Sequence, residues 1–232
     1  MSLYDRNYAN SRQEEVSSSY AETNLSTFIK QTYQLLAASL LAASAGAYVG
    51  IGMAASFSAP IFIGLVIAEF ALLFGLTAAK RKAGLNLVLL FAFTFVSGLT
   101  LTPLLTRFLS MPGGAAIVAQ AFTLTTVAFG GLSVFAMNTK RDFTAMGKML
   151  FITLIVLLVA AIINIFFHSP VLQLAIASVG AVLFSAYILY DTQNIIRGNY
   201  ETPIEGAVDL YLDFLNLFVS LLSILGFFNS DD

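Results

Sequence analysis

Seven apolar stretches, each long enough to cross a bilayer as a helix, dominate this sequence. Crossing takes about 20 helical residues at a rise of 1.5 Å each. The stretches cover residues 26–50, 61–79, 85–105, 115–137, 149–167, 171–190 and 207–228. Hydrophobic residues make up 58% of the chain and charged residues only 10%, which is too little polar surface for a soluble domain. The sequence therefore predicts an all-α integral membrane protein with seven transmembrane helices.

The chain divides into a polar N-terminal tail, residues 1–25, and a transmembrane domain, residues 26–232. The tail lacks a basic start followed by a short apolar core and a cleavage site, so we expect no removable signal peptide. Very few residues separate the fifth and sixth stretches, which predicts a tight helical hairpin there.

The basic residues predict the orientation. When the spans alternate in direction, Arg107 is the only one of the eleven Lys and Arg residues that falls on the second side. The positive-inside rule then makes the N-terminus cytoplasmic, in a multi-pass protein of the cell (inner) membrane. Seven spans put the C-terminal Asp231 and Asp232 on the far side, whereas six would reverse that end. The sequence leaves open whether the last helix crosses completely.

The last stretch carries a polar stripe in an apolar helix. Its members recur at steps of four and three, which places them on one helix face: Asp209, Asp213, Asn216, Ser220 and Ser223. A carboxylate at depth costs roughly 2.5 kcal/mol or more unless it is paired, protonated or hydrated, so we interpret Asp213 as functional. Asp209 lies nearer the interface, where a solvated first-turn acid is the ordinary explanation. Contacts between helices would equally explain Ser220 and Ser223.

Other charged residues gather near the same membrane boundary. The second span ends at Lys80, the sixth ends at Asp191, and the seventh begins with the acids of the stripe, all on the predicted cytoplasmic side. Glu69 lies midway along the second span, either as a structural hydrogen-bond hub or as an acid that lines a pathway. Gly46 and Gly50, four residues apart, predict a close-packing face inside the protein.

Several classes of function are disfavoured. The sequence has no Cys, which removes disulfides, thiolate metal sites and Cys nucleophiles. His168 is the only histidine, so a histidine metal cluster is not expected. Phosphate loops and dinucleotide fingerprints are missing, and basic residues are too few for nucleic-acid binding. We therefore expect no resident cofactor and no enzymatic activity.

Two segments, "SAYILYDTQNII" (residues 185–196) and "LYLDFLNLFVSLLSILG" (residues 210–226), closely resemble the bacterial branch of the transmembrane Bax inhibitor motif family. "FAFTFVSGLTLTPLL" (residues 91–105) and the close turn at residues 167–170 add to the resemblance, which spans all seven helices and omits the tail. The resemblance implies a seven-helix fold with the last helix at the centre of the other six.

The resemblance also implies a function, a pH-sensitive calcium leak. Its paired aspartates, which sense pH and bind the ion, would be Asp191 and Asp213. Family members latch this pair with an arginine at the end of the second helix, where this chain has Lys80 followed by Arg81. Lysine lacks the planar fork of arginine, so the latch would be looser or would use Arg81.

A mechanism follows from such a pair. Two nearby carboxylates in a partly dry site cannot both stay charged cheaply, so we expect the pair to share one proton. After the proton leaves, calcium, which takes hard oxygen ligands, would compete for the same site. The stripe residues Asn216, Ser220 and Ser223, with Glu69 and Asp209, would line the pathway onward. The expected partners are thus the lipid bilayer and calcium ions.

Three other classes compete with this interpretation. An intramembrane aspartyl protease needs Gly-x-Gly-Asp where this chain has Leu210-Tyr211-Leu212-Asp213, which argues against catalysis. A non-conducting modulator of a membrane-bound quality-control protease, or of another membrane partner, would use the polar tail as its contact. A retinal-type receptor is excluded because the seventh span contains no lysine.

Overall fold

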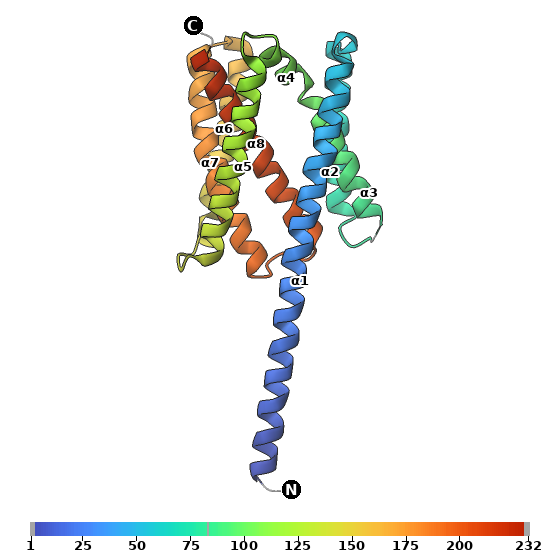
Figure 1. The fold of residues 1–232 in the computed structure, drawn as a ribbon, viewed down its shortest axis with the longest axis vertical. Coiled ribbons are helices and arrows are strands. Elements are labelled where there is room, and N and C mark those ends of the chain that lie inside the picture. The colour runs from blue at the N-terminus through green and yellow to red at the C-terminus, as the bar shows by residue number, and fades with distance from the viewer. Residues whose placement is uncertain (1–2, 83, 230–232) are drawn as a thin grey trace.

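The computed structural model describes residues 3–82 and 84–229, and this part of the chain contains helices and no strand. The helical elements follow one another in a single bundle (Figure 1). They are α1 (Leu3–Gly52), η1 (Ala54–Ser56), α2 (Ala59–Ala78), α3 (Leu85–Thr100), α4 (Thr102–Leu109), α5 (Gly114–Asn138), η2 (Thr144–Met146), α6 (Gly147–Phe167), α7 (Pro170–Ile196) and α8 (Pro203–Asn229).

Seven helical segments of the described chain are long and apolar enough to cross a membrane, which confirms the predicted number of spans. The third of these is interrupted, because α3 ends at Thr100 and α4 restarts at Thr102 with Pro103 in its first turn. Proline lacks the backbone N–H that a continuous helix would need there. The two spans nearest the predicted site are longer than expected: α7 continues to Ile196 and α8 begins at Pro203.

The last helix lies at the centre of the bundle, as the family resemblance implies. α8 packs against α7, α1, α5 and α3. In the most apolar segment of α8, half of the residues are buried inside the protein, compared with 6% in the corresponding segment of α2 and 11% in that of α6. Mean hydropathy runs the opposite way, at 1.9 for α8, 2.3 for α2 and 3.0 for α6. Helices that face lipid must be apolar all round, whereas a central helix can carry polar groups because other helices surround it.

Close contact between α1 and α3 supports one flank of α8. A Cβ atom added to Gly46 would lie 2.0 Å from the carbonyl oxygen of Phe95, and one added to Gly98 would lie 2.0 Å from that of Ala43. Neither position leaves room for a side chain, so the two backbones touch. The predicted close-packing face on the first span is therefore confirmed as an internal contact.

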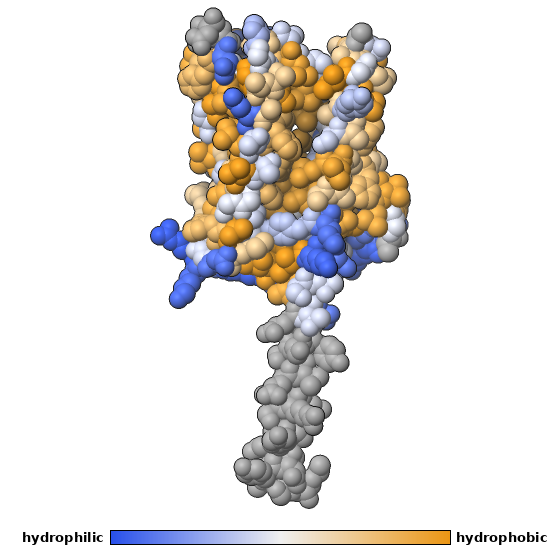
Figure 2. Space-filling view, viewed as in Figure 1, coloured by the Kyte–Doolittle hydropathy of each residue, from blue (hydrophilic) through white to orange (hydrophobic). Residues whose placement is uncertain are grey.

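The outer surface is suited to a bilayer. Large apolar side chains on the periphery, such as Phe74 at 71% and Phe166 at 78% exposure, extend outward. Hydrophobic residues cover the sides of the bundle, and strongly hydrophilic ones gather at the end from which α1 projects (Figure 2). This chain is therefore a multi-pass membrane protein.

The predicted hairpin between the fifth and sixth spans is also confirmed. α6 ends at Phe167 and α7 begins at Pro170, with the hydroxyl of Ser169 accepting a hydrogen bond from the N–H of Leu172 at the start of α7. His168 makes the turn with a left-handed backbone, φ 49°. This turn lies at the opposite end of the bundle from the loop between α7 and α8 (Figure 1).

Candidate functional site

The hairpin between α7 and α8 brings the acidic residues of both helices together. Residues 197–202 reverse the chain between the two helices, with Gly198 in a left-handed conformation (φ 69°) that favours glycine. Counted from Pro203, Asp213 lies about 15 Å along α8 at 1.5 Å per residue. Asp191 lies within α7 rather than at its end, because that helix continues to Ile196. Both acids are therefore inside membrane-spanning helices.

Asp191 and Asp213 form the centre of the site. These two residues are only 5% and 4% exposed, and their carboxyl groups lie close enough for a hydrogen bond between them. Such a bond between two carboxyl groups needs a proton on one of them. The Oδ2 atom of Asp213 is buried and has no hydrogen-bond partner among the described residues. Asn194, one turn along α7 from Asp191, accepts a hydrogen bond from the side chain of Asn199, 2.9 Å away.

Tyr200 joins the pair to a third acid. Its phenol oxygen lies 2.6 Å from Oδ1 of Asp191 and 2.9 Å from Oδ2 of Asp209. A phenol has one hydrogen to donate, so it can serve only one carboxylate fully at a time. Burial, followed by the charges of Asp191 and Asp209, raises the pKa of Tyr200 and keeps the phenol protonated. The groups form a continuous chain from Asp213 through Asp191 and Tyr200 to Asp209.

Asp209 differs from the sequence expectation of a solvated acid. It is half-buried rather than exposed, and its carboxylate contacts Tyr200. The reason is that α8 begins four residues earlier than predicted, which moves Asp209 from the helix start into its second turn.

Lys80 and Arg81 bind the loop between α7 and α8. The Nζ atom of Lys80 lies 3.2 Å from Oε1 of Glu201 and 3.1 Å from Oε1 of Glu205. Arg81 donates from Nε and Nη2 to Oε2 of Glu201, at 2.9 and 2.7 Å. We call these four residues the ion-pair strap. Within the described part of the chain, the ion pairs of Lys80 and Arg81 are with these glutamates and not with the paired aspartates.

The ion-pair strap is an exposed structure. The hydrogen bonds that Lys80 donates to Glu205 and Glu201 raise the pKa of Lys80. Those that Glu201 accepts from Arg81 and Lys80 lower the pKa of Glu201, so Lys80 and Glu201 both stay charged near neutral pH. Arg81 is 76% exposed and Lys80 31%, so solvent and salt screen both. Glu205 also accepts hydrogen bonds from the N–H groups of Glu201 and Thr202, which fixes the start of α8.

Glu69 lies away from the aspartates, on the α2 side of the bundle. It is half-buried, and its Oε2 accepts a hydrogen bond of 2.9 Å from the hydroxyl of Thr100 on α3. The same hydroxyl also contacts the carbonyl oxygen of Ser97, whose side chain is hydrogen-bonded to Tyr211 on α8. These hydrogen bonds connect α2 to α8 through Thr100 and Ser97.

The far half of the polar stripe makes local contacts. Asn216 and Ser223 each donate to a backbone carbonyl four residues earlier in α8, those of Leu212 and Val219. Ser220 is buried against α7, since a Cβ atom on Gly180 would lie 2.7 Å from its hydroxyl oxygen. Ser223 also lines a cleft at the end of the bundle opposite the aspartates. The stripe is thus continuous in sequence, but its members have different surroundings.

Sequence reasoning missed Tyr200 and the two glutamates, Glu201 of the loop and Glu205 in the first turn of α8. Tyr200 sits in a polar loop, where nothing in the residue pattern marks it as buried. One signal was available: the acids Glu201 and Glu205 follow the sixth span, and the basic Lys80 and Arg81 follow the second, on the same predicted side. Opposite charges at one membrane boundary favour pairing.

The site offers oxygen ligands for a cation. Carboxylates are hard ligands of the kind calcium prefers, and the buried Oδ2 of Asp213 lacks any partner that the described residues could supply. Among those residues, no cluster of three or more His, Cys, Asp or Glu side chains is arranged to hold a metal ion. A pair of carboxylates supplies fewer oxygens than the six to eight of a tight calcium site. Asp191 and Asp213 alone would therefore not complete a tight calcium site.

The chain is similar to known proteins over its whole membrane domain. The model of a family described as "Inhibitor of apoptosis-promoting Bax1" matches residues 25–230. An uncharacterised protein of Campylobacter jejuni is 66% identical, over 99% of this chain and 100% of its own. An uncharacterised membrane protein of Vibrio cholerae is 40% identical, over 91% of this chain and 93% of its own. Protein lifeguard 4 of the mouse is 37% identical, over 72% of this chain and 69% of its own.

Proposed function

Because this chain belongs to the family of inhibitors of apoptosis-promoting Bax1, we propose that it is a pH-sensitive calcium leak of the bacterial inner membrane. The single observation that carries the proposal is the buried contact between Asp191 and Asp213 inside two membrane helices. A purely structural helix pair would avoid such a contact, since each membrane carboxylate costs about 2.5 kcal/mol or more.

The first step is loss of a proton from the pair. With the proton present, one carboxyl group donates to the other, and the site carries a single negative charge. Without it, two buried carboxylates repel each other, and a divalent cation would neutralise both. Calcium and the proton would therefore compete for Asp191 and Asp213, and acidification of the cytoplasm would reduce conduction.

The second step is opening of the loop that covers the pair. Tyr200 ties this loop to Asp191 and Asp209, and the neighbouring Glu201 is held by Lys80 and Arg81. In this proposal Lys80 and Arg81 act as the gate latch indirectly, by holding the loop instead of the aspartates. Release of the ion-pair strap would let Tyr200 withdraw and expose the pair.

The pathway beyond the pair would follow the polar stripe of α8. Asn216, Ser220 and Ser223 offer hydroxyl and amide groups toward the opposite end, and Glu69 would contribute from α2. Asn216 and Ser223 now bond to their own helix, so conduction requires these side chains to turn toward the passing ion.

A flux assay tests the proposal. Purified protein in liposomes should carry calcium down its gradient at a rate above that of protein-free liposomes, measured with an enclosed calcium dye. Wild-type protein denatured before reconstitution is the control for nonspecific leakage. Calcium flux no greater than in either control would refute the leak.

Orientation is part of the proposal and has its own test. With the N-terminus in the cytoplasm, a reporter fused after Asp232 should report the far side of the membrane and one fused at Met1 the cytoplasm. Signals from the same side would contradict seven complete crossings and would place the aspartates differently.

A non-conducting modulator of a membrane-bound protease, or of another membrane partner, is the second candidate. The observation that favours it is the length of α1, which extends well beyond the bundle (Figure 1). Deletion of residues 1–22 should then abolish capture of the partner from solubilised membranes while leaving calcium flux unchanged. Calcium flux abolished by the same deletion would argue against a separate docking role.

A further inference from the structure

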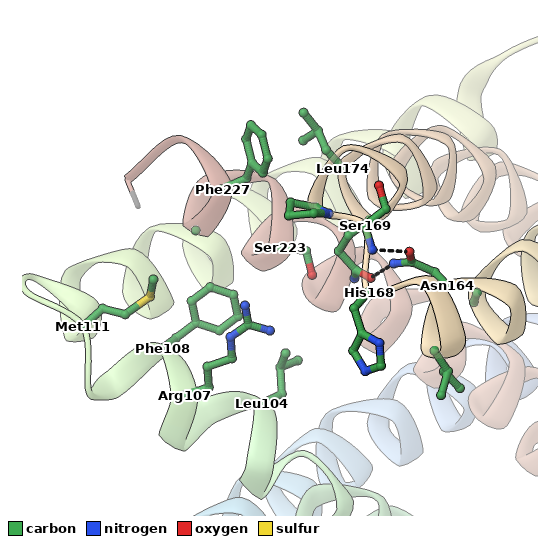
Figure 3. A pocket seen from close by; sticks show the side chains of 15 residues that line it. Leu104, Arg107, Phe108, Met111, Asn164, His168, Ser169, Leu174, Ser223 and Phe227 are labelled. Atoms are coloured by element: carbon green, nitrogen blue, oxygen red, sulfur yellow. Dashed lines mark hydrogen bonds between the residues drawn. The ribbon is translucent and has the colours of Figure 1, made fainter. Parts of the chain in front are cut away.

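A cleft of about 710 Å³ opens between α4, α6, α7 and α8, at the end of the bundle opposite the paired aspartates (Figure 3). Pockets of this size hold small organic molecules. Most of its lining is apolar, including Leu104, Phe108, Ile165, Leu174 and Phe227, and none of its lining residues is an acid.

Two basic side chains face the cleft from different walls. Arg107 reaches in from α4, and His168 projects from the turn between α6 and α7 (Figure 3). Within the described residues, the guanidinium of Arg107 has no ion pair. The start of α7 at Pro170 adds the positive end of a helix dipole to the same space. The cleft therefore combines apolar walls with positive potential.

The neutral polar groups of the wall are mostly occupied with each other. Asn164 donates to Oε1 of Gln173 at 3.0 Å and accepts from the backbone N–H of Ser169 at 3.0 Å. These bonds fix the turn that presents His168. Nδ1 of His168 lies 3.3 Å from the carbonyl oxygen of Phe166, so the groups left to bind a ligand are Arg107, Nε2 of His168 and the side-chain nitrogen of Gln173.

The backbone of His168 gives a second, independent observation. Its φ of 49° lies in the left-handed region, where glycine carries no steric cost and other residues are uncommon. Left-handed caps at helix ends are usually glycine. Histidine is one of the non-glycine residues that adopt this region most readily, so the turn accommodates His168 and places its imidazole at the rim of the cleft.

We propose that this cleft binds an anionic glycerophospholipid from the adjacent leaflet, with its phosphate against Arg107 and His168 and its acyl chains along the apolar wall. Ser223, at the far end of the proposed calcium pathway, borders this cleft, but the charge of Arg107 would repel a cation, so the leak does not explain the basic character of the cleft. The apolar walls would gain nothing from a small soluble anion, whereas a lipid satisfies both the charge and the hydrophobic surface. This inference does not depend on the leak.

Lipid retention measured by native mass spectrometry tests the proposal. The full chain is purified in detergent and titrated with phosphatidylglycerol or with phosphatidylcholine of the same acyl chains. Phosphatidylglycerol should bind about tenfold more tightly, the factor that corresponds to about 1.4 kcal/mol. Equal affinity for the two lipids would overturn the assignment, since the positive charge of Arg107 would then have no role.

Three variants locate the site. Arg107→Gln and His168→Gly should each remove most of the preference for phosphatidylglycerol. The glycine relieves the left-handed backbone of residue 168, so this variant should fold at least as well as the wild type. Lys140→Gln, an exposed basic residue at the other end of the bundle, is the matched control and should change nothing. Full preference in both cleft variants, or its loss in the control, would overturn the proposal.

Two further experiments distinguish a bound lipid from other anions in the cleft. Inorganic phosphate, added at the concentration that saturates binding with phosphatidylglycerol, should not displace the lipid, and displacement would indicate a site for soluble phosphate. Asp231→Asn combined with Asp232→Asn should leave lipid affinity unchanged. A tenfold gain in that variant would mean that the chain's own carboxylates compete for Arg107, and would overturn the lipid as the usual occupant.

Discussion

The two ends of α8 border sites of opposite charge. At its first turns, Asp209 and Asp213 are covered by α7 and by the loop that carries Tyr200. The carboxyl group of Asp213 contacts that of Asp191, and the carboxyl group of Asp209 contacts the phenol of Tyr200. At its last turns, α8 borders an open cleft, and the side chains of Arg107 and His168 line this cleft. One end is closed and acidic, whereas the other is open and basic.

The difference shows which polar residues of a membrane helix are costly. Ser223, near the open end, satisfies its hydroxyl on its own helix, which requires no partner from elsewhere in the protein. Asp213 cannot do so, because a carboxylate has no hydrogen to donate to a backbone carbonyl. It needs a proton, a cation or a donor from another helix, and each of these can be exchanged. A buried acid is therefore a better candidate for a switch than a buried hydroxyl.

Tyr200→Phe should produce the largest change at the closed end. The variant removes the hydroxyl that bridges Asp191 and Asp209 and keeps the ring. Hydrogen bonds to charged groups contribute about 1.5–3 kcal/mol, so calcium leak in liposomes should rise by about tenfold.

Tyr190→Phe is the matched control for this substitution. Tyr190 lies near the same end of α7, and no hydrogen bond of its hydroxyl occurs within the described part of the chain. Its leak should equal that of the wild type. If Tyr200→Phe leaves the leak unchanged, the phenol bridge has no part in closing the site.

The ion-pair strap should matter less, because it is exposed. Lys80→Ala should raise the leak by about two- to threefold, and Arg81→Ala by less, since Lys80 joins both glutamates and is the less exposed of the two. Added salt should shrink both differences by screening the ion pairs. If neither substitution changes flux at low salt, these basic residues act only as a topology signal.

The smallest effect is expected at an ion pair on the loop side of α7. Arg197 holds the pKa of Asp142 down to about 2. Because this folded-state pKa lies below the ordinary value of about 3.9, the pair's contribution to stability is complete above about pH 4 and is lost as pH falls toward 2.

Thermal melts check the effect at Asp142. Asp142→Asn should melt slightly below the wild type at pH 7, and the two should converge as the pH is lowered. Its calcium flux should not change. A difference in melting temperature that grows at low pH would contradict the assigned ion pair.

Most of the fold was predictable because the bilayer restricts the choices. A lipid-exposed chain must bond its backbone internally, so each long apolar stretch predicts a helix. The exceptions depend on local groups. Hydropathy does not register the break at Leu101, which comes from Pro103, and it ends α7 too early because Asp191, Thr192 and Gln193 are polar but helical.

The site was only half predictable. Asp213 is conspicuous because a carboxylate in an apolar stretch is rare, whereas its pairing with Asp191 was implied by the family resemblance, and the structure brings the two into contact. Tyr200 is an ordinary loop residue by sequence, and its burial depends on how the turn at Gly198 folds back on α7. The partners of Lys80 depend in the same way on the path of the loop, which periodicity cannot give.

The central claim is that Asp191 and Asp213 share one proton and one cation site. The most direct measurement is calcium flux in liposomes over about pH 6 to 8 for the wild type, Asp191→Asn, Asp213→Asn and the double variant. Asn keeps the shape but ends the repulsion between two carboxylates, so each single variant should lose most of the pH dependence, and the double variant should add little. Asp142→Asn serves as the control. A wild-type pH profile in correctly folded Asp213→Asn protein would contradict the account and leave the polar stripe as a packing surface.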